Sequence, residues 1–164
     1  MRDVDFDALV ERIQGEVFAE ARVALGDKGF ERWRNPRFCG VMADADGHAR
    51  LKGSCGDSVE IYLKADGQRV VAAQYVTDGC GTSAVAASFT AELAIGKSFA
   101  EVLAMTGADV LAEVGAFPRE EEHCAHLAVS TLQKALQEYL SARSPSGLSP
   151  ATQKGDNPCP QQRG

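Results

Sequence analysis

Apolar residues recur at three- and four-residue steps through residues 6–25, which predicts an amphipathic helix. The repeating positions are Phe6, Leu9, Val10, Ile13, Val17 and Ala21. Gly26 follows this stripe and is expected to end the helix, because glycine is common just beyond a helix C-terminus. A second short helix is predicted at 30–34, before Pro36, since proline disfavours helical geometry in the residue that precedes it.

The pattern changes to alternation at residues 59–64, where every second residue is apolar and lies on one face of a predicted strand. Residues 66–67, Asp-Gly, supply a tight turn, and the run 70–77 forms the next strand. Residues 58–77 therefore predict an antiparallel hairpin. An earlier strand at about 48–53 is expected to pair along its edge.

From residue 82 onward the spacing of apolar residues predicts helices rather than strands. They are expected from Thr82 or Ser83 to Gly96, from Ser98 to Leu103 with Glu101 completing a capping box, over 108–114 before Gly115, and from Pro118 to about 141. The buried side of the last helix is expected to carry Ala128, Leu132, Ala135, Leu136, Tyr139 and Leu140. Residues 142–164 have no apolar period and predict a disordered tail. Strands followed by helices predict an α+β domain, with a small antiparallel sheet packed against about five helices.

Composition narrows the class of protein. Of the 164 residues, 45% are apolar and 24% are charged, as in one globular domain with a tail. No run approaches the roughly 18 apolar residues that cross a bilayer, and the acidic first seven residues lack the layout of a secretory signal. The formal net charge of −6 would repel a polyanion. We therefore expect a cytoplasmic protein that binds neither membranes nor nucleic acid.

Five cysteines are many for a reducing cytoplasm, and no two of them form a Cys-x-x-Cys pair. That absence disfavours a zinc ribbon, a thioredoxin-type redox pair and a ferredoxin. Cys55, Cys80 and Cys124 lie where predicted elements meet, which is where functional side chains commonly lie. Glycines beside Cys55 and Cys80 allow the backbone to approach a bulky ligand. The predicted helix N-termini beside Cys80 and Cys124 favour the thiolate.

Each candidate residue also has a plain structural interpretation. A single cysteine is more often a small buried residue than a ligand, and Asp57 is common as a cap or turn residue. His123 is compatible with a helix surface, with His126 as its neighbour on about the same face. The acids at Asp78 and 120–122 would raise thiol pKa values nearby. No single residue identifies a functional site, so the identification depends on the order of the motifs along the chain.

Taken in order, the motifs resemble the iron–sulfur cluster assembly scaffold family of the IscU type, which also occurs as the N-terminal domain of NifU. The matching pieces are Asn35-Pro36, Cys55-Gly56-Asp57, Asp78-Gly79-Cys80-Gly81 with the small-residue stretch Thr82 to Ser88, Gly96-Lys97-Ser98 and His123-Cys124. They cover about residues 30–141. The resemblance therefore implies a scaffold domain there, preceded by a helical extension at 1–29 and followed by the tail at 142–164.

The resemblance implies that Cys55, Cys80 and Cys124 meet at one exposed edge and bind a 2Fe–2S cluster, with 4Fe–4S left open. Three thiolates leave one of four terminal positions vacant, for which the resemblance implies Asp57 or His123. It also implies that a cysteine desulfurase supplies sulfur, that Cys124 accepts the persulfide, and that the cluster passes to apo-proteins. Such a protein is a scaffold or carrier rather than an enzyme. Whether it acts as a homodimer stays open.

Two features depart from the family pattern. A Leu-Pro-Pro-Val-Lys stretch in the family is bound by a DnaK/J-type chaperone, whereas residues 117–122 here are Phe-Pro-Arg-Glu-Glu-Glu. That replacement argues against participation of the chaperone. Cys39 and Cys159 are additional, and we expect Cys39 to be buried rather than metal-bound and Cys159 to be an exposed bystander in the tail.

Two other functions fit the same residues. Three cysteines with Asp57 or His123 also form a workable tetrahedral zinc set, as in a zinc-binding sulfur acceptor that partners a desulfurase. A thiol-dependent enzyme would use Cys124 as nucleophile and His123 as base. Adjacent helix residues point about 100° apart, so we expect that pair to be poorly placed.

Overall fold

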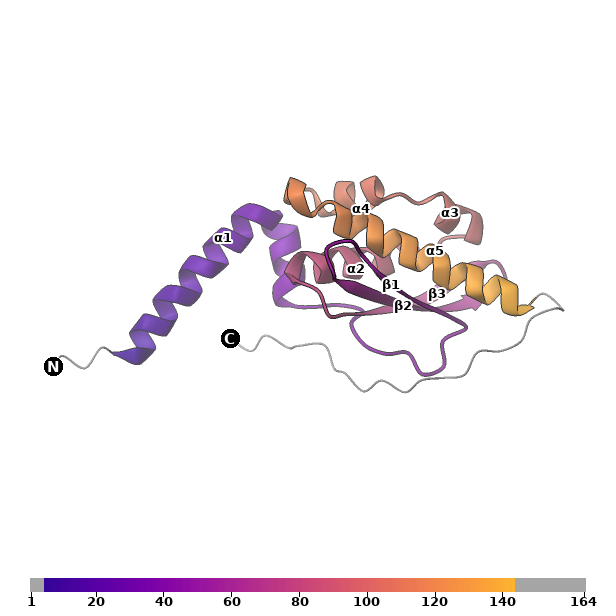
Figure 1. Ribbon diagram of the computed structural model, residues 1–164, viewed down its shortest axis with the longest axis horizontal. Coiled ribbons are helices and arrows are strands. Elements are labelled where there is room, and N and C mark those ends of the chain that lie inside the picture. Colours follow the sequence, from indigo (N-terminus) through magenta and orange to yellow (C-terminus); the bar gives the residue numbers. More distant parts are fainter. Residues whose placement is uncertain (1–4, 144–164) are drawn as a thin grey trace.

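The computed structural model describes residues 5–143 (Figure 1). Its elements in chain order are α1 (Phe6–Arg34), β1 (Gly47–Lys52), β2 (Ser58–Asp66), β3 (Arg69–Thr77), α2 (Gly81–Ala94), α3 (Phe99–Ala104), α4 (Gly107–Val114), the 3-10 turn η1 (Arg119–Glu121) and α5 (His123–Arg143). The strands form one antiparallel sheet in the order β1-β2-β3. The predicted α+β class, with a three-stranded sheet and five α-helices in the described part, is therefore confirmed. The tail predicted for 142–164 lies outside the described residues from position 144 onward.

The sheet has one face covered by helices and one polar face. Along β2, Val59, Ile61 and Leu63 are fully buried, and the residues between them are partly exposed. The buried face packs against α2 and α5, which lie on the same side of the sheet in Figure 1. The alternation in the sequence thus follows from one-sided burial, and removal of this apolar surface from water stabilises the fold.

Helix α2 is buried on nearly all sides. Residues 85–91 are all buried, and most of their side chains are small. Small side chains let the helix backbone approach the sheet, α5 and α1 closely. A helix that is apolar around its circumference belongs in a protein interior. The position of α2 in turn fixes the loop before it, which carries Cys80.

Helix α1 is broken at Gly26, whose backbone has φ 65° and ψ 176°. The predicted helix end at Gly26 is confirmed by this break, although helix resumes directly afterwards instead of at residue 30. The first segment projects away from the rest of the domain (Figure 1). Its apolar stripe stays largely in solvent, with Phe6 73%, Ile13 48% and Val17 47% exposed.

The second segment of α1 is held by a buried arginine. The Arg32 guanidinium donates to Ser88 Oγ at 3.0 Å, pairs with the Glu92 carboxylate, and lies 4.0 Å from the centre of the Phe89 ring. A buried charge is tolerated when it is paired and hydrogen-bonded, as this one is. Arg32 therefore attaches α1 to the middle of α2.

Two predicted details were wrong. Cys80 is the N-cap of α2, so neither Thr82 nor Ser83 caps that helix; both hydroxyls face the cysteine thiols instead. Leu140, predicted to be buried, is 37% exposed because it lies near the end of α5. By contrast, the capping box of Ser98 and Glu101 is present as expected.

Among residues 5–143, no helix has the length and apolar character that crossing a bilayer requires.

We predict that Gly47→Ala destabilises the domain by about 1–3 kcal/mol, the usual cost of overpacking. A Cβ atom at this position would lie 2.5 Å from the Ala135 carbonyl oxygen and 3.0 Å from Tyr139 Cβ, so β1 and α5 would have to separate. Urea unfolding followed by circular dichroism measures the change. Gly15→Ala is the matched control, because no atom lies within 4 Å of its Cβ. Equal stability of the two variants would contradict the close packing of α5 on β1.

Candidate metal centre

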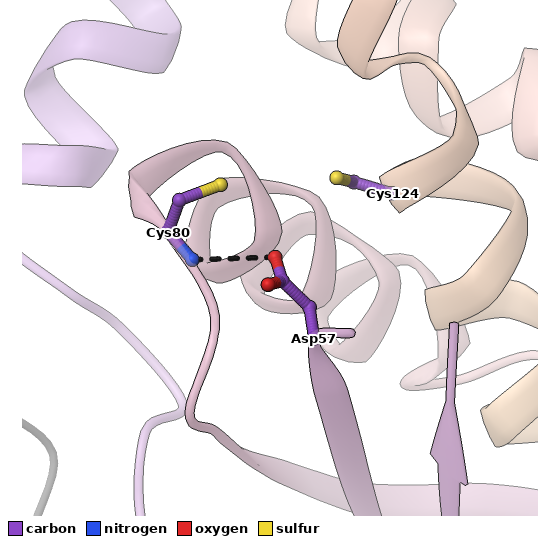
Figure 2. A group of neighbouring side chains, drawn as sticks. All are labelled: Asp57, Cys80 and Cys124. Carbon is purple, nitrogen blue, oxygen red and sulfur yellow. Dashed lines mark hydrogen bonds between the residues drawn. The ribbon is translucent and has the colours of Figure 1, made fainter. Parts of the chain in front are cut away.

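Asp57, Cys80 and Cys124 place a carboxylate oxygen and two sulfurs within 4.8 Å of one another. Figure 2 shows the two thiols directed into the same space, with the Asp57 carboxylate beside them. Asp57 directly precedes β2, Cys80 is the N-cap of α2, and Cys124 is the second residue of α5. Residues that are far apart in the sequence therefore meet at one end of the sheet.

The strand register explains this meeting. Val59 pairs with Thr77, so the residues before β2 lie beside those after β3. The Ser58 amide donates to Asp78 Oδ1 at 2.6 Å, which fixes the two loops together. Gly79 is required for their approach, because a Cβ atom there would lie 2.5 Å from Asp57 Oδ2.

Ser83 lies at the centre of the ligand group and is fully buried. Its Oγ is 2.6 Å from Asp57 Oδ2 and 3.3 Å from Cys124 Sγ. A hydroxyl has one proton to donate, and the carboxylate is the stronger acceptor of the two. This bond, aided by the Cys80 amide at 3.3 Å, lowers the pKa of Asp57 below its ordinary value. The Asp57 carboxylate is therefore anionic at neutral pH and could serve as an oxygen ligand.

Cys124 is only 1% exposed, and burial raises the pKa of its thiol to about 11. Hydrogen bonds from Ser83 and Thr82 lower this pKa, and the charges of Cys80 and Glu121 raise it. The helix N-terminus was expected to favour the thiolate and the nearby acids to oppose it; burial and the charge of Glu121 prevail, so the thiol keeps its proton. A metal ion would have to displace this proton.

Cys80 and Cys55 are both exposed, unlike Cys124. Cys80 Sγ lies 2.8 Å from Thr82 Oγ1, at the predicted position beside a helix N-terminus. Cys55 lies two residues before Asp57, in a loop closed by the bond from the Gly53 amide to the Asp57 carbonyl at 2.8 Å. Its sulfur belongs to neither ligand group found among the described residues. The three-thiol set therefore stays a prediction, with two of its members brought together here.

His123 lies closer to Cys124 than expected. The distance from His123 Nε2 to Cys124 Sγ is 3.6 Å, although the two residues are adjacent on α5. His123 is the first residue of the helix, and its side chain folds back over the start of α5. Glu121, His123 and Cys124 form a second group of ligand atoms within 4.8 Å of one another. His126 belongs to neither group, and its ring lies against Gly107 of α4.

Cys39 is a second departure from expectation. It is partly exposed, although burial was predicted. Its backbone forms an isolated β-bridge with Tyr75 of β3. It is not one of the free thiols. Cys159 lies outside the described residues.

Trp33 is a residue near the site that the motifs did not indicate. Its indole Nε1 lies 2.6 Å from the point that a Cβ atom on Gly81 would occupy, so the ring covers the backbone next to Cys80. Phe18 and Phe30 pack against Trp33 with ring centres 6.0 and 5.9 Å away. Ser83 was equally hard to predict, although its position three residues after Cys80 places it on the same helix face.

Comparison with known proteins shows the family of this chain and agrees with its fold. The model of the NifU-like N terminal domain matches residues 25–145. The chain is 34% identical over 115 residues to the iron–sulfur cluster assembly scaffold protein IscU 1 of Archaeoglobus fulgidus, covering 70% of this chain and 75% of the relative. It is 28% identical over 126 residues to IscU of Escherichia coli K12, covering 74% and 98%. The chain belongs to the NifU-like N-terminal domain family, as its motifs predicted.

A solved structure shows the same fold. The N-terminal part of a nitrogen-fixing NifU-like protein from Brucella abortus superposes with a TM-score of 0.58 at 18% identity, covering 73% of this chain and 96% of that one. The two IscU relatives are named as assembly scaffolds, not as enzymes. The prediction of a scaffold in place of a thiol-dependent enzyme agrees with those names.

We predict that Co²⁺ binding to the Asp57 group quenches the fluorescence of Trp33, which is the sole tryptophan of the chain. The Trp33 ring lies against Gly81, the residue after Cys80. A thiolate-bound Co²⁺ absorbs visible light and is paramagnetic, whereas Zn²⁺ does not absorb visible light and is diamagnetic. Anaerobic titration with each ion measures the effect. Cys80→Ser is the control and should lose the quenching. Equal responses to Co²⁺ and Zn²⁺ would contradict the placement of Trp33 beside the site.

Proposed function

We propose that this protein is a scaffold on which an iron–sulfur cluster is assembled before it passes to apo-proteins. The observation that carries the proposal is the convergence of Asp57, Cys80 and Cys124 at the starts of α2 and α5. Two sulfurs and a carboxylate in this arrangement suit iron or zinc better than Mg²⁺ or Ca²⁺. Relatives of this chain are named as scaffolds for such clusters.

The cluster is cargo rather than a resident cofactor. Cys80 and Cys124 would supply two terminal thiolates of a 2Fe–2S centre, and Cys55 would supply a third after movement of its exposed loop. Asp57 or His123 would complete the set. An oxygen or nitrogen ligand holds the cluster less tightly than a fourth thiolate does, which favours transfer over storage.

We assign Cys124 as the acceptor of sulfur from a cysteine desulfurase. Its thiol lies 3.6 Å from His123 Nε2, which can take the proton. The resulting thiolate attacks the terminal sulfur of the desulfurase persulfide; a new S–S bond forms, the old one breaks, and the desulfurase cysteine leaves as thiolate. Because Cys124 is buried and Cys80 exposed, the desulfurase would dock at the edge where Cys80 lies.

The remaining expectations follow from the same surface. Residues 119–122 are one arginine followed by three glutamates, so we propose that no DnaK/J-type chaperone binds this stretch. The net charge of −6 fits protein partners better than nucleic acid. The place of action that we propose is the cytoplasm.

We predict that the protein purified and reconstituted without oxygen contains iron and acid-labile sulfide in equal amounts, and that Cys80→Ser loses most of both. The substitution removes one of the two sulfurs of the Asp57, Cys80 and Cys124 group. Iron and sulfide analysis, with ultraviolet–visible spectra, gives the measurement. His126→Gln is the control, because His126 is a potential ligand that lies in neither group. A colourless protein that retains zinc under these conditions would favour the zinc-binding sulfur acceptor instead.

We also predict that Cys124→Ser abolishes persulfide formation when the protein is incubated with a cysteine desulfurase and cysteine. The serine hydroxyl cannot accept sulfane sulfur, whereas Cys55→Ser leaves the acceptor in place. Mass spectrometry of the intact chain detects the added mass of sulfur. Undiminished sulfur on Cys124→Ser would remove the assignment.

A further inference from the structure

A second set of metal-binding atoms adjoins the Asp57 group and shares Cys124 with it. Glu121 Oε2 and His123 Nε2 each lie 3.6 Å from Cys124 Sγ, and they lie 4.0 Å from each other. Donor atoms around a tetrahedral ion held at roughly 2.0–2.3 Å stand about 3.3–3.8 Å apart. The observed triangle needs a contraction of only a few tenths of an ångström along one side.

The His123 ring is already oriented for an ion. Its Nδ1 lies 3.0 Å from the Glu120 carbonyl oxygen, and a carbonyl can only accept a hydrogen bond. Nδ1 therefore carries the proton and Nε2 presents its lone pair toward Cys124 and Glu121. Metal-binding histidines are commonly held in this way by a carbonyl on the other ring nitrogen.

The charge around this triangle attracts a cation. Residues 120–122 are three glutamates in a row. Across residues 5–143, neither lysine nor arginine forms an ion pair with any of them, and the basic group beside the Glu121 carboxylate is the His123 ring, 4.0 Å away. An unneutralised carboxylate beside an imidazole and a thiol gives a mixed oxygen, nitrogen and sulfur set, which suits a divalent first-row ion.

We propose that Glu121, His123 and Cys124 form a second cation subsite, which takes a ferrous ion next to the one held by Asp57, Cys80 and Cys124. The identity of the ion rests on the proposed function; the subsite itself rests on the triangle. Cys124 belongs to both sets and would contribute its sulfur to both ions after losing its proton to solvent. A 2Fe–2S cluster needs two irons side by side, and this arrangement gathers them before sulfur arrives.

The test is anaerobic titration of the full chain with Co²⁺, followed by absorption and calorimetry. The wild type should bind two ions, and Glu121→Gln should weaken one of them at least about tenfold and leave the other unchanged. Glu122→Gln is the matched control: it removes the same charge from the neighbouring, exposed residue and should still bind two ions. Cys124→Ser should weaken both ions.

Three results would overturn the proposal: one ion on the wild type, two equally tight ions on Glu121→Gln, or a parallel loss with Glu122→Gln. Circular dichroism of each variant confirms that it is folded. Failure of the proposed function is separable, because it shows as absence of acid-labile sulfide from the reconstituted wild type. If sulfide is absent, the number of Co²⁺ ions bound by the wild type and by Glu121→Gln still tests whether the second cation subsite exists.

Discussion

The burial of α2 on all sides is the constraint on which the rest of the domain depends. The small side chains at 86–88 allow the sheet, α5 and the second segment of α1 to contact the same helix. Because those neighbours hold α2 in place, its N-terminal end is fixed next to the start of α5. Cys80 and Cys124 are therefore positioned by packing of the core.

A single buried hydroxyl organises the charges of the metal-free site. Ser83 lies against both the Asp57 carboxylate and the Cys124 thiol but has only one proton to donate. It stabilises the anion on Asp57 and so lowers the pKa of that carboxyl, while burial raises the pKa of the Cys124 thiol and keeps its sulfur protonated. The resting site thus carries one negative charge on Asp57 and a neutral Cys124. A bound cation would move the negative charge toward sulfur, because it would replace the thiol proton.

Most of the fold could be predicted because its signals are local. The alternation of apolar and polar residues predicted β2, and Asp66-Gly67 predicted the turn of the hairpin. Gly26 and Gly115 predicted helix ends. The site was predictable only as a set of motifs. Depth is a tertiary property, so the sequence could not show that Cys124 is buried while Cys80 is exposed.

Three-dimensional packing also decided the roles of residues near the motifs. Ser83 resembles a helix cap in the sequence and contacts the ligands in the structure. Trp33 lies 48 positions before Gly81 in the chain, and no periodicity connects the two. Glu121 was recognised only as one of several acids near the site, since its distance to Cys124 depends on how η1 leads into α5.

In the proposed function, the unequal depth of the thiols would give ligand exchange a direction. Cys55 and Cys80 lie at the surface, and Cys124 lies at the bottom of the group. An acceptor protein that approaches from solvent meets the outer sulfurs first, so its own thiolates would replace those before reaching the inner one. The bonds from iron to the exposed thiolates would then break first and the bond to Cys124 last. The iron would pass from one protein to the other without entering bulk water as a free ion.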